Sequence, residues 1–402
     1  MNQGIIAAVL SILFYLTSLL SGGQGQAIQP AEPPVTQQSY TVIGQAGTVV
    51  ADRITVRHSP SADGKPLGTV SRNTSLTILD QSGSWYKIRP RLGTEGWVPD
   101  FAVAVRDVQR QETDFRILGF YPGGDEAYES LIENGAKLSG IAPLGWRLDS
   151  YGQLSADPGF APEEVGRSLY FAGNQKMDTF AHVQVGASPS PLLSDEKLQA
   201  DSIRQFLAAI SEWGLKGALV DIDYILQAEQ QELFEFLKTL KAKLGQEGLT
   251  VIVALPWNEN IDYELAAEAG NYIVLKANAP DQPGPLTPYP EARAMLEEVT
   301  SALPADKIIL AVTTGGTAWS EAGSPVSLSH REVLELAAQE GASIKWDANA
   351  KTPYFQCGSG RRVWFENRYS IKYKLDLAEE FGLGGLALKY LGEEDSEIWA
   401  RL

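Results

Sequence analysis

From Phe115 to the C-terminus, short apolar segments alternate with amphipathic segments whose apolar residues recur at i, i+3, i+4 and i+7. The apolar segments with the length of a buried strand are Arg116–Tyr121, Leu138–Trp146, Thr179–Val185, Gly217–Tyr224, Thr250–Pro256, Tyr272–Lys276, Lys307–Val312 and Gly385–Tyr390. Eight strand–helix units in succession predict an α/β fold, a (β/α)8 TIM barrel over residues 115–402. Gly341–Trp364 departs from the alternation, and we expect a small β-rich insertion there, between the seventh and eighth strands.

Residues 39–105, between linkers at 28–38 and 106–114, have short alternating strands separated by turns, which predict a small all-β barrel. They resemble the bacterial SH3-like domain in the stretches Thr55–Pro60, Gly68–Val70, Gly83–Ile88 and Gly96–Val98. The resemblance implies a cell-wall-binding module, although such domains also serve as spacers. Trp85 is the candidate wall-binding residue. Core packing is the competing interpretation for Trp85 and the favoured one for Trp97.

The N-terminal segment is apolar from Ile5 to Leu20, and small residues follow at Gly25 and Ala27, positions −3 and −1 of a cleavage site. This pattern predicts a signal peptide over residues 1–27, although no Lys or Arg precedes the apolar run. An uncleaved anchor is the alternative, but the run is short for a membrane span. We therefore expect a secreted or cell-envelope protein of a bacterium, with no membrane association after cleavage.

Composition limits the partners of the chain. The 33 Lys and Arg residues against 50 Asp and Glu residues give a net charge of −17, which argues against nucleic acid and anionic membranes as ligands. Cys357 is the one cysteine, and the three histidines lie far apart in sequence. We therefore predict no disulfide, no metal site and no cofactor.

The fourth strand candidate ends in the acidic sequence Asp221-Ile222-Asp223-Tyr224-Ile225. Because strand side chains alternate in direction, Asp221, Asp223 and Ile225 are expected to share the face that points into the barrel. Two carboxylates in a barrel interior are costly unless they are paired or hydrogen-bonded. Such residues usually mark a functional site, and a solvated strand end is the plainer alternative.

The segment Phe115–Leu402 is similar to family-18 glycoside hydrolases of the spore-cortex or wall-lytic type. The motifs that carry this resemblance are Leu118–Tyr121, Trp146–Asp149 with Gly152, Asp221–Tyr224, Ile309–Val312 with Gly316 and Trp319, Thr352–Phe355, Val363–Asn367, Ser370–Ile371, Lys374, Gly382–Gly385, Leu391–Gly392 and Ile398–Trp399. The resemblance implies a substrate-assisted mechanism, in which the N-acetyl group of the sugar is the nucleophile and a glutamate is the proton donor.

The chain departs from the family at four parts of that apparatus. The strand-four motif D-x-x-D-x-D-x-E places Ala218 at its first Asp and Ile225 at the proton donor. The strand-six motif M-x-Y-D falls on Lys276–Ala279, with Asn278 at the tyrosine, and the tryptophan that ends strand eight falls on Lys389. An isoleucine has no proton to donate, and general acid catalysis is typically worth about 10²–10⁴-fold. Loss of glycosidase activity is therefore the favoured interpretation.

The lysines that replace the lost groups suggest a hypothesis about the retained acids. We expect Lys276 and Lys389 to pair with Asp221, Asp223 or both, because buried carboxylates need a counter-charge. The competing idea is that these lysines bind an acidic ligand. His182, within the third strand, is expected to be a core histidine.

Other residues are candidates for replacing the proton donor or for holding a glycan. The substitutes for the donor, all in loops or helix starts, are Glu229, Glu232, Asn258, Glu259 and Asp262. The ligand-binding candidates are Tyr121, Trp146, Tyr224, Trp257, Lys276, Asn278, Trp319 and Lys389. For the tryptophans, including Trp346, core packing is an equal alternative.

These observations favour an exported envelope protein that binds peptidoglycan or a chitin-like, N-acetylglucosamine-containing glycan. The binding would use the SH3-like module and a glycosidase-like barrel without catalysis. One alternative is an active chitinase- or N-acetylglucosaminidase-type hydrolase with a relocated acid. The other is a protein-interaction scaffold that the SH3-like module locates at the wall.

Overall fold

A computed structural model describes residues 42–106, 114–186, 188–257, 260–277, 282–319 and 325–402. The expected signal peptide, the first linker and most of the second linker lie outside these ranges. No helix within the described ranges is long and apolar enough to span a bilayer.

The segment after the first linker forms a small antiparallel sheet with its own core. Its strand order is β3-β2-β6-β5-β4-β1-β7. The strands are β1 (Ala46–Val49), β2 (Arg53–Arg57), β3 (Pro66–Ser71), β4 (Ser75–Ser82), β5 (Trp85–Pro90), β6 (Gly96–Pro99) and β7 (Val103–Arg106). Val56, Ile78, Ile88 and Val98 are fully buried between them. The predicted small all-β domain is thus confirmed.

The second part is a closed ring of parallel strands, because β8 pairs with both β21 and β9. In ring order the strands are β8 (Arg116–Tyr121), β9 (Gly140–Leu148), β11 (Asp178–Val185), β12 (Gly217–Ile222), β13 (Thr250–Pro256), β14 (Tyr272–Lys276), β15 (Ile308–Thr313) and β21 (Gly385–Lys389). The short β10 (Leu154–Ala156) lies antiparallel to β9. The (β/α)8 barrel is therefore confirmed, and β12 ends two residues earlier than predicted.

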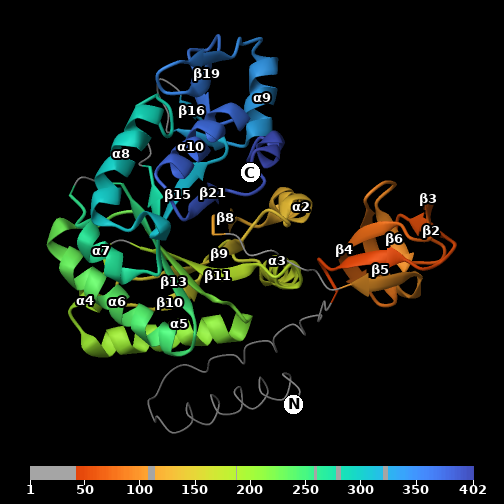
Figure 1. The fold of residues 1–402 in the computed structure, drawn as a ribbon, viewed down its shortest axis with the longest axis horizontal. Helices are drawn as coiled ribbons and strands as arrows, with labels where there is room; N and C mark the ends of the chain where they lie inside the picture. The colour runs from red at the N-terminus through yellow and green to blue at the C-terminus, as the bar shows by residue number, and fades with distance from the viewer. Residues whose placement is uncertain (1–41, 107–113, 187, 258–259, 278–281, 320–324) are drawn as a thin grey trace, which may run out of the picture. The chain divides into compact units, whose positions relative to one another are not determined.

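Helices cover the outside of the ring, as Figure 1 shows for α5 to α8. They are α2 (Gly124–Asn134), α3 (Pro162–Asn174), α4 (Ser190–Leu193), α5 (Glu196–Trp213), α6 (Gln230–Gln246), α7 (Tyr263–Ala269), α8 (Tyr289–Ala302) and α10 (Arg368–Glu380). Alternate strand residues divide the apolar core in two. Phe120, Leu219 and Val274 belong to an inner cluster, which we call the barrel interior. Val220 and Ile222 belong to the cluster between strands and helices, which we call the barrel wall.

The insertion between β15 and β21 is larger than the sequence suggests. It is an antiparallel sheet in the order β17-β16-β20-β19-β18, together with α9 (His330–Gln339). The strands are β16 (Gly316–Trp319), β17 (Val326–Leu328), β18 (Lys345–Asp347), β19 (Thr352–Gln356) and β20 (Arg362–Phe365). The prediction that it starts at Gly341 was wrong, because β16 leaves the ring and pairs antiparallel with β20, Gly316 opposite Phe365.

Candidate functional site

Side chains from three strands meet in one polar cluster at the carboxyl ends of the barrel. It consists of His182 on β11, Asp221 on β12, Lys276 on β14 and Asp223 just after β12, and we call it the mouth cluster. Lys276 Nζ donates to Asp221 Oδ1 and, at 2.6 Å, to Asp223 Oδ1. His182 Nε2 lies 2.8 Å from Asp221 Oδ2. Each carboxylate is therefore engaged by a cationic or N–H donor.

Strand alternation places these side chains inside the ring. Leu219 on β12 and Val274 on β14 face the barrel interior, so Asp221 and Lys276, two residues further along each strand, face it as well. The registers pair Asp221 with Ala254 of β13 and Lys276 with Pro256. Lys276 therefore starts about two residues above Asp221, and its long side chain reaches across β13 to the aspartates.

Burial makes the pairing in the mouth cluster strong. His182, Asp221 and Lys276 are 3%, 4% and 5% exposed, respectively. Burial by itself raises the pKa of Asp221, but the His182 hydrogen bond and the Lys276 charge outweigh it and hold that pKa well below its usual range. Asp221 is thus ionised and can only accept, so the His182 Nε2 carries the proton of their hydrogen bond. His182 is a buried core histidine, as expected, and its contact with Asp221 was not foreseen.

Ile225 does not continue the inward face of the strand. β12 ends at Ile222, Tyr224 is 69% exposed, and Ile225 is half-buried against the barrel wall. The expectation that Ile225 shares a face with the two aspartates was therefore wrong. The strand stops before its alternation reaches that residue, and a hydrocarbon side chain packs more favourably on the apolar wall than over a cluster of charges.

Lys389 does not join the mouth cluster. No ion pair links it to either aspartate within the described ranges, and its ammonium group lies 5.7 Å from the centre of the Tyr390 ring. The predicted pairing is thus correct for Lys276 and wrong for Lys389. The side chain of Lys389 starts at the end of β21, on the opposite side of the ring from β12.

Residues 184–391, a little over half of the 402 residues, match the sequence pattern of glycosyl hydrolases family 18. The chain belongs to glycosyl hydrolase family 18. Residues 52–102 match the bacterial SH3 domain.

Curated relatives of this family-18 chain include the cortical fragment-lytic enzyme of Bacillus subtilis (strain 168). The two sequences are 26% identical over 234 residues, which cover 52% of this chain and 54% of that protein. The chain spans about half the length of the curated relatives it matches first. Among solved structures, the spore cortex-lytic enzyme SleL of Bacillus megaterium QM B1551 has a TM-score of 0.64 and 21% identity, with 76% of each chain covered. A chitinase from Chromobacterium violaceum ATCC 12472 has a TM-score of 0.63 and 22% identity, covering 71% of this chain and 97% of that one. These likenesses show the fold.

A carboxyl group missed in the sequence, that of Glu393, lies near the end of β21 in the family-18 barrel. A Cβ atom built on Gly315, which follows β15, would lie 3.3 Å from Glu393 Oε2, so this carboxylate sits at the ends of strands seven and eight. It has no hydrogen bond or ion pair with any described residue. Burial and the neighbouring Glu394 raise its pKa to about 7. In the sequence, Glu393 is a loop glutamate next to Glu394, and this pattern does not predict a buried carboxyl with a raised pKa.

The charges of both Glu393 and the mouth cluster act on the hydroxyl of Tyr390. Burial, followed by the charges of Asp221 and Glu393, raises the pKa of the Tyr390 hydroxyl to about 12. Its ring centre lies 6.5 Å from that of Phe120 in the barrel interior. The tyrosine therefore stays neutral beside acids on both sides.

Most of the predicted ligand-binding residues lie elsewhere. Tyr121 and Trp146 are buried in the barrel wall, where Trp146 packs on Phe160 and Trp213. Trp319 is 8% exposed in the insertion sheet. These placements correct the expectation, because a strand residue that faces the helices cannot reach the mouth.

The remaining candidates lie at separate places in the barrel and in the SH3-like domain. Tyr224 is exposed, Trp257 is half-buried against the barrel wall, and Asn278 lies outside the described residues. Trp85 and Trp97 are both half-buried and outside the apolar core of the SH3-like domain, so the favoured core role of Trp97 was wrong. Trp346 is 40% exposed.

Among the acids proposed as substitutes for the proton donor, Glu229 and Asp262 have other partners. Ser188 Oγ donates to Glu229 at 2.7 Å, and Asp262 caps α7 by accepting from the Leu265 N–H at 3.0 Å. Glu232 is exposed in the first turn of α6, while Asn258 and Glu259 lie outside the described residues. No metal-ligand cluster of His, Cys, Asp and Glu occurs among the residues that the structure describes.

A cavity of about 860 Å³ lies away from the mouth cluster. Residues of α2, α9, α10 and the segment after β21 line it, among them Glu129, Arg331, Tyr369 and Trp399. Neither Lys276 nor Lys389 lines it. The idea that these lysines bind an acidic ligand in a deep pocket therefore gains no support from this cavity.

Proposed function

We propose that this chain is an exported cell-envelope protein that binds peptidoglycan or another N-acetylglucosamine-containing glycan, and that its barrel no longer hydrolyses glycosidic bonds. The observation that carries the loss of catalysis is the ion pairing of Lys276 with both Asp221 and Asp223. In the substrate-assisted mechanism, the aspartate at position 223 would orient the N-acetyl group of the sugar. Here its Oδ1 is bonded to a lysine, and the neighbouring acid position has only the hydrocarbon side chain of Ile225.

The kinetic consequence follows from the chemistry of the leaving group. A sugar alkoxide leaves slowly unless it is protonated as the bond breaks, and losing that assistance typically slows the reaction by about 10²–10⁴-fold. Lys276 also neutralises the negative field that would stabilise a developing positive charge on the sugar. The missing proton donor and the charge of Lys276 would both slow hydrolysis.

The glycan partner is inferred from the two families. A curated relative is named a cortical fragment-lytic enzyme, and residues 52–102 match the bacterial SH3 domain, a kind of domain that resembles wall-targeting modules. Aromatic side chains that stay partly exposed, such as Trp85 and Trp97, suit stacking on sugar rings. Export rests on the apolar N-terminal segment of the sequence.

Turnover of a fluorogenic chito-oligosaccharide and sedimentation with purified peptidoglycan or chitin test this proposal. We expect sedimentation without turnover, and we expect no turnover after Ile225→Glu alone, because the strand has already ended there. Clear turnover by the unmutated chain that Asp223→Ala abolishes would contradict the loss of catalysis. Absence of sedimentation with either polymer would contradict the glycan partner.

A second function has one observation in its favour. Glu393 is a half-buried carboxyl with a pKa of about 7, so much of it carries a proton at neutral pH, as a general acid requires. An active hydrolase with a relocated acid would lose turnover in Glu393→Gln and keep glycan binding. The third alternative, a wall-located protein scaffold, would predict that neither polymer binds the barrel.

A further inference from the structure

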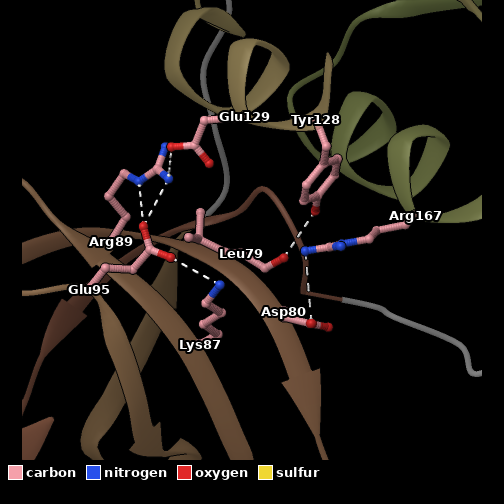
Figure 2. Close-up of polar contacts among 8 residues, drawn as sticks. All are labelled: Leu79, Asp80, Lys87, Arg89, Glu95, Tyr128, Glu129 and Arg167. Atoms are coloured by element: carbon pink, nitrogen blue, oxygen red, sulfur yellow. Dashed lines mark hydrogen bonds and ion pairs between the residues drawn. The ribbon is translucent and has the colours of Figure 1, made fainter. Parts of the chain in front are cut away.

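The SH3-like domain contacts helices α2 and α3 of the barrel, as Figure 2 shows. The Tyr128 hydroxyl on α2 donates to the Leu79 carbonyl of β4 at 3.0 Å, and Tyr128 is 5% exposed. The Arg167 guanidinium on α3 lies 3.7 Å from the centre of the Tyr128 ring and 3.9 Å from Asp80 Oδ2. This is a cation–π contact and an ion pair at one point of contact.

A second point of contact is a chain of charges. Arg89 on β5 donates to Glu95 Oε2 at 2.8 Å within the SH3-like domain and to Glu129 Oε1 of α2 at 2.5 Å. Lys87 pairs with the other oxygen of Glu95 at 3.0 Å. Glu95 therefore holds the Arg89 guanidinium in the orientation that meets Glu129.

The third point of contact combines apolar packing with hydrogen bonds and lies at the start of the SH3-like domain. Ile43 is fully buried and belongs to the barrel wall. Asn174, at the end of α3, donates to the Ile43 carbonyl at 2.5 Å, and Gln175 donates to the Gly44 carbonyl. Gly44 has φ +82°, and a Cβ atom there would lie 2.8 Å from the Phe171 carbonyl oxygen. Glycine is thus required for this close approach.

These contacts differ from those of a module on a flexible tether. A buried carbonyl that lost its hydrogen-bond partner would destabilise the chain, so the Tyr128–Leu79 bond favours the state in which the two surfaces stay together. The described residues of both domains, from Val42 onward, also belong to one compact unit. We propose that the SH3-like domain is docked permanently on α2 and α3, so that it and the barrel engage a glycan as one rigid surface.

The docked face also carries the candidate sugar-stacking residues. Ile88 faces the SH3-like core, so Trp85, Lys87 and Arg89 alternate to the outer face of β5. Trp97 of β6 lies opposite Lys87 in the register and shares that face. The tryptophans are therefore held on the same sheet face as the residue that meets Glu129. This step rests on the proposed function, since it assumes a glycan ligand.

Fixed docking changes how a glycan would bind. Two modules on a flexible tether lose orientational freedom when both bind the same glycan chain. Docked modules have already lost that freedom when the protein folds. Cutting the chain between the domains should therefore leave both the assembly and its glycan binding intact.

The experiment places a specific protease site within residues 107–113 of the full chain and cuts it after folding. We expect the two pieces to co-elute as one species on size exclusion at micromolar concentration. Arg89→Glu should weaken their association by roughly tenfold or more, because two glutamates would then face each other. The double variant Arg89→Glu, Glu129→Arg should restore it. Arg72→Ala, which removes an exposed ion pair with Asp52 on the same domain, should have no effect.

The outcomes separate docking from glycan binding. Cut pieces that elute apart while each keeps its circular-dichroism spectrum would overturn the docking. Co-elution without peptidoglycan sedimentation of the intact chain would uphold docking and contradict only the proposed function. If Arg89→Glu proves unstable before cutting, the uncut and cut forms of Tyr128→Phe provide the same comparison with a smaller change.

Discussion

Lys276 Nζ bridges Asp221 and Asp223 from two strands away, and it is the cationic residue of the mouth cluster. The pairing lies where relatives of the family are expected to bind the acetamido group of a sugar. A lysine at this position therefore changes both the charge and the space that a substrate would meet.

Removing that lysine tests how far the barrel depends on the pairing. We expect Lys276→Met to lower the free energy of unfolding by about 3–5 kcal/mol, because Asp221 would remain buried without its counter-charge. Urea unfolding followed by circular dichroism measures the change. The double variant Lys276→Met, Asp221→Leu should recover much of the loss, and Lys238→Ala, in an exposed ion pair with Glu268, should change little. Full stability of the single variant would contradict a structural role for the pair.

The low pKa of Asp221 predicts sensitivity to acid. Because its folded-state pKa lies below the unfolded value of about 3.9, its contribution to stability is complete above that pH and is lost as the pH falls further. Urea unfolding between pH 3 and pH 7 should show a decline below about pH 4. Asp221→Asn should be less stable at neutral pH and should lose less on acidification. Parallel curves for the two proteins would argue against this linkage.

Glu393 should have the opposite pH dependence. Its pKa is raised to about 7, so the folded chain binds a proton that the unfolded chain has released, and stability decreases as pH rises from about 4.3 to about 7. Allowing for its partial exposure, we expect Glu393→Gln to be more stable by about 1–2 kcal/mol at pH 8 and similar at pH 4. Carbon-13 NMR of the carboxyl gives the pKa directly, and a value near 4.5 would contradict the prediction.

The tryptophans of the SH3-like domain should affect binding and not folding. Trp85 and Trp97 lie outside its apolar core, so either change to Ala should leave the thermal midpoint close to that of the unmutated chain. Peptidoglycan affinity should fall by about tenfold for each, which corresponds to ~1.4 kcal/mol. Sedimentation with a dilution series measures the affinity, and Trp346→Ala in the insertion is the matched control. Unchanged affinity in both variants would move the glycan contact elsewhere.

The buried pair of Glu366 and Lys374 should stabilise the insertion. Lys374 Nζ donates to both carboxylate oxygens at 2.6 Å, and the residues are 0% and 2% exposed. Lys374→Met would leave Glu366 without a counter-charge at the end of β20, so we expect a loss of about 3–5 kcal/mol. Hydrogen exchange of the insertion sheet should show the effect first. The exposed pair of Lys372 and Asp376 provides a control one turn away.

Local sequence patterns are enough to specify the two folds and the family. Strand periodicity is local, because alternate residues must face either the interior or the helices, so the limits of Arg116–Tyr121, Thr250–Pro256 and Tyr272–Lys276 could be predicted to the residue. The hydrocarbon at Ile225 and the lysine at position 276 could also be recognised, since they depend only on motif spacing.

Which of these side chains come into contact depends on how the whole chain folds. Lys276 reaches the aspartates and Lys389 does not, because partners in a closed ring depend on strand order, register and side-chain length together. The early end of β12, the half-buried carboxyl of Glu393 and the docking of Tyr128 on Leu79 have the same origin. Burial and contact between distant segments arise from packing the whole chain, and no local pattern specifies them.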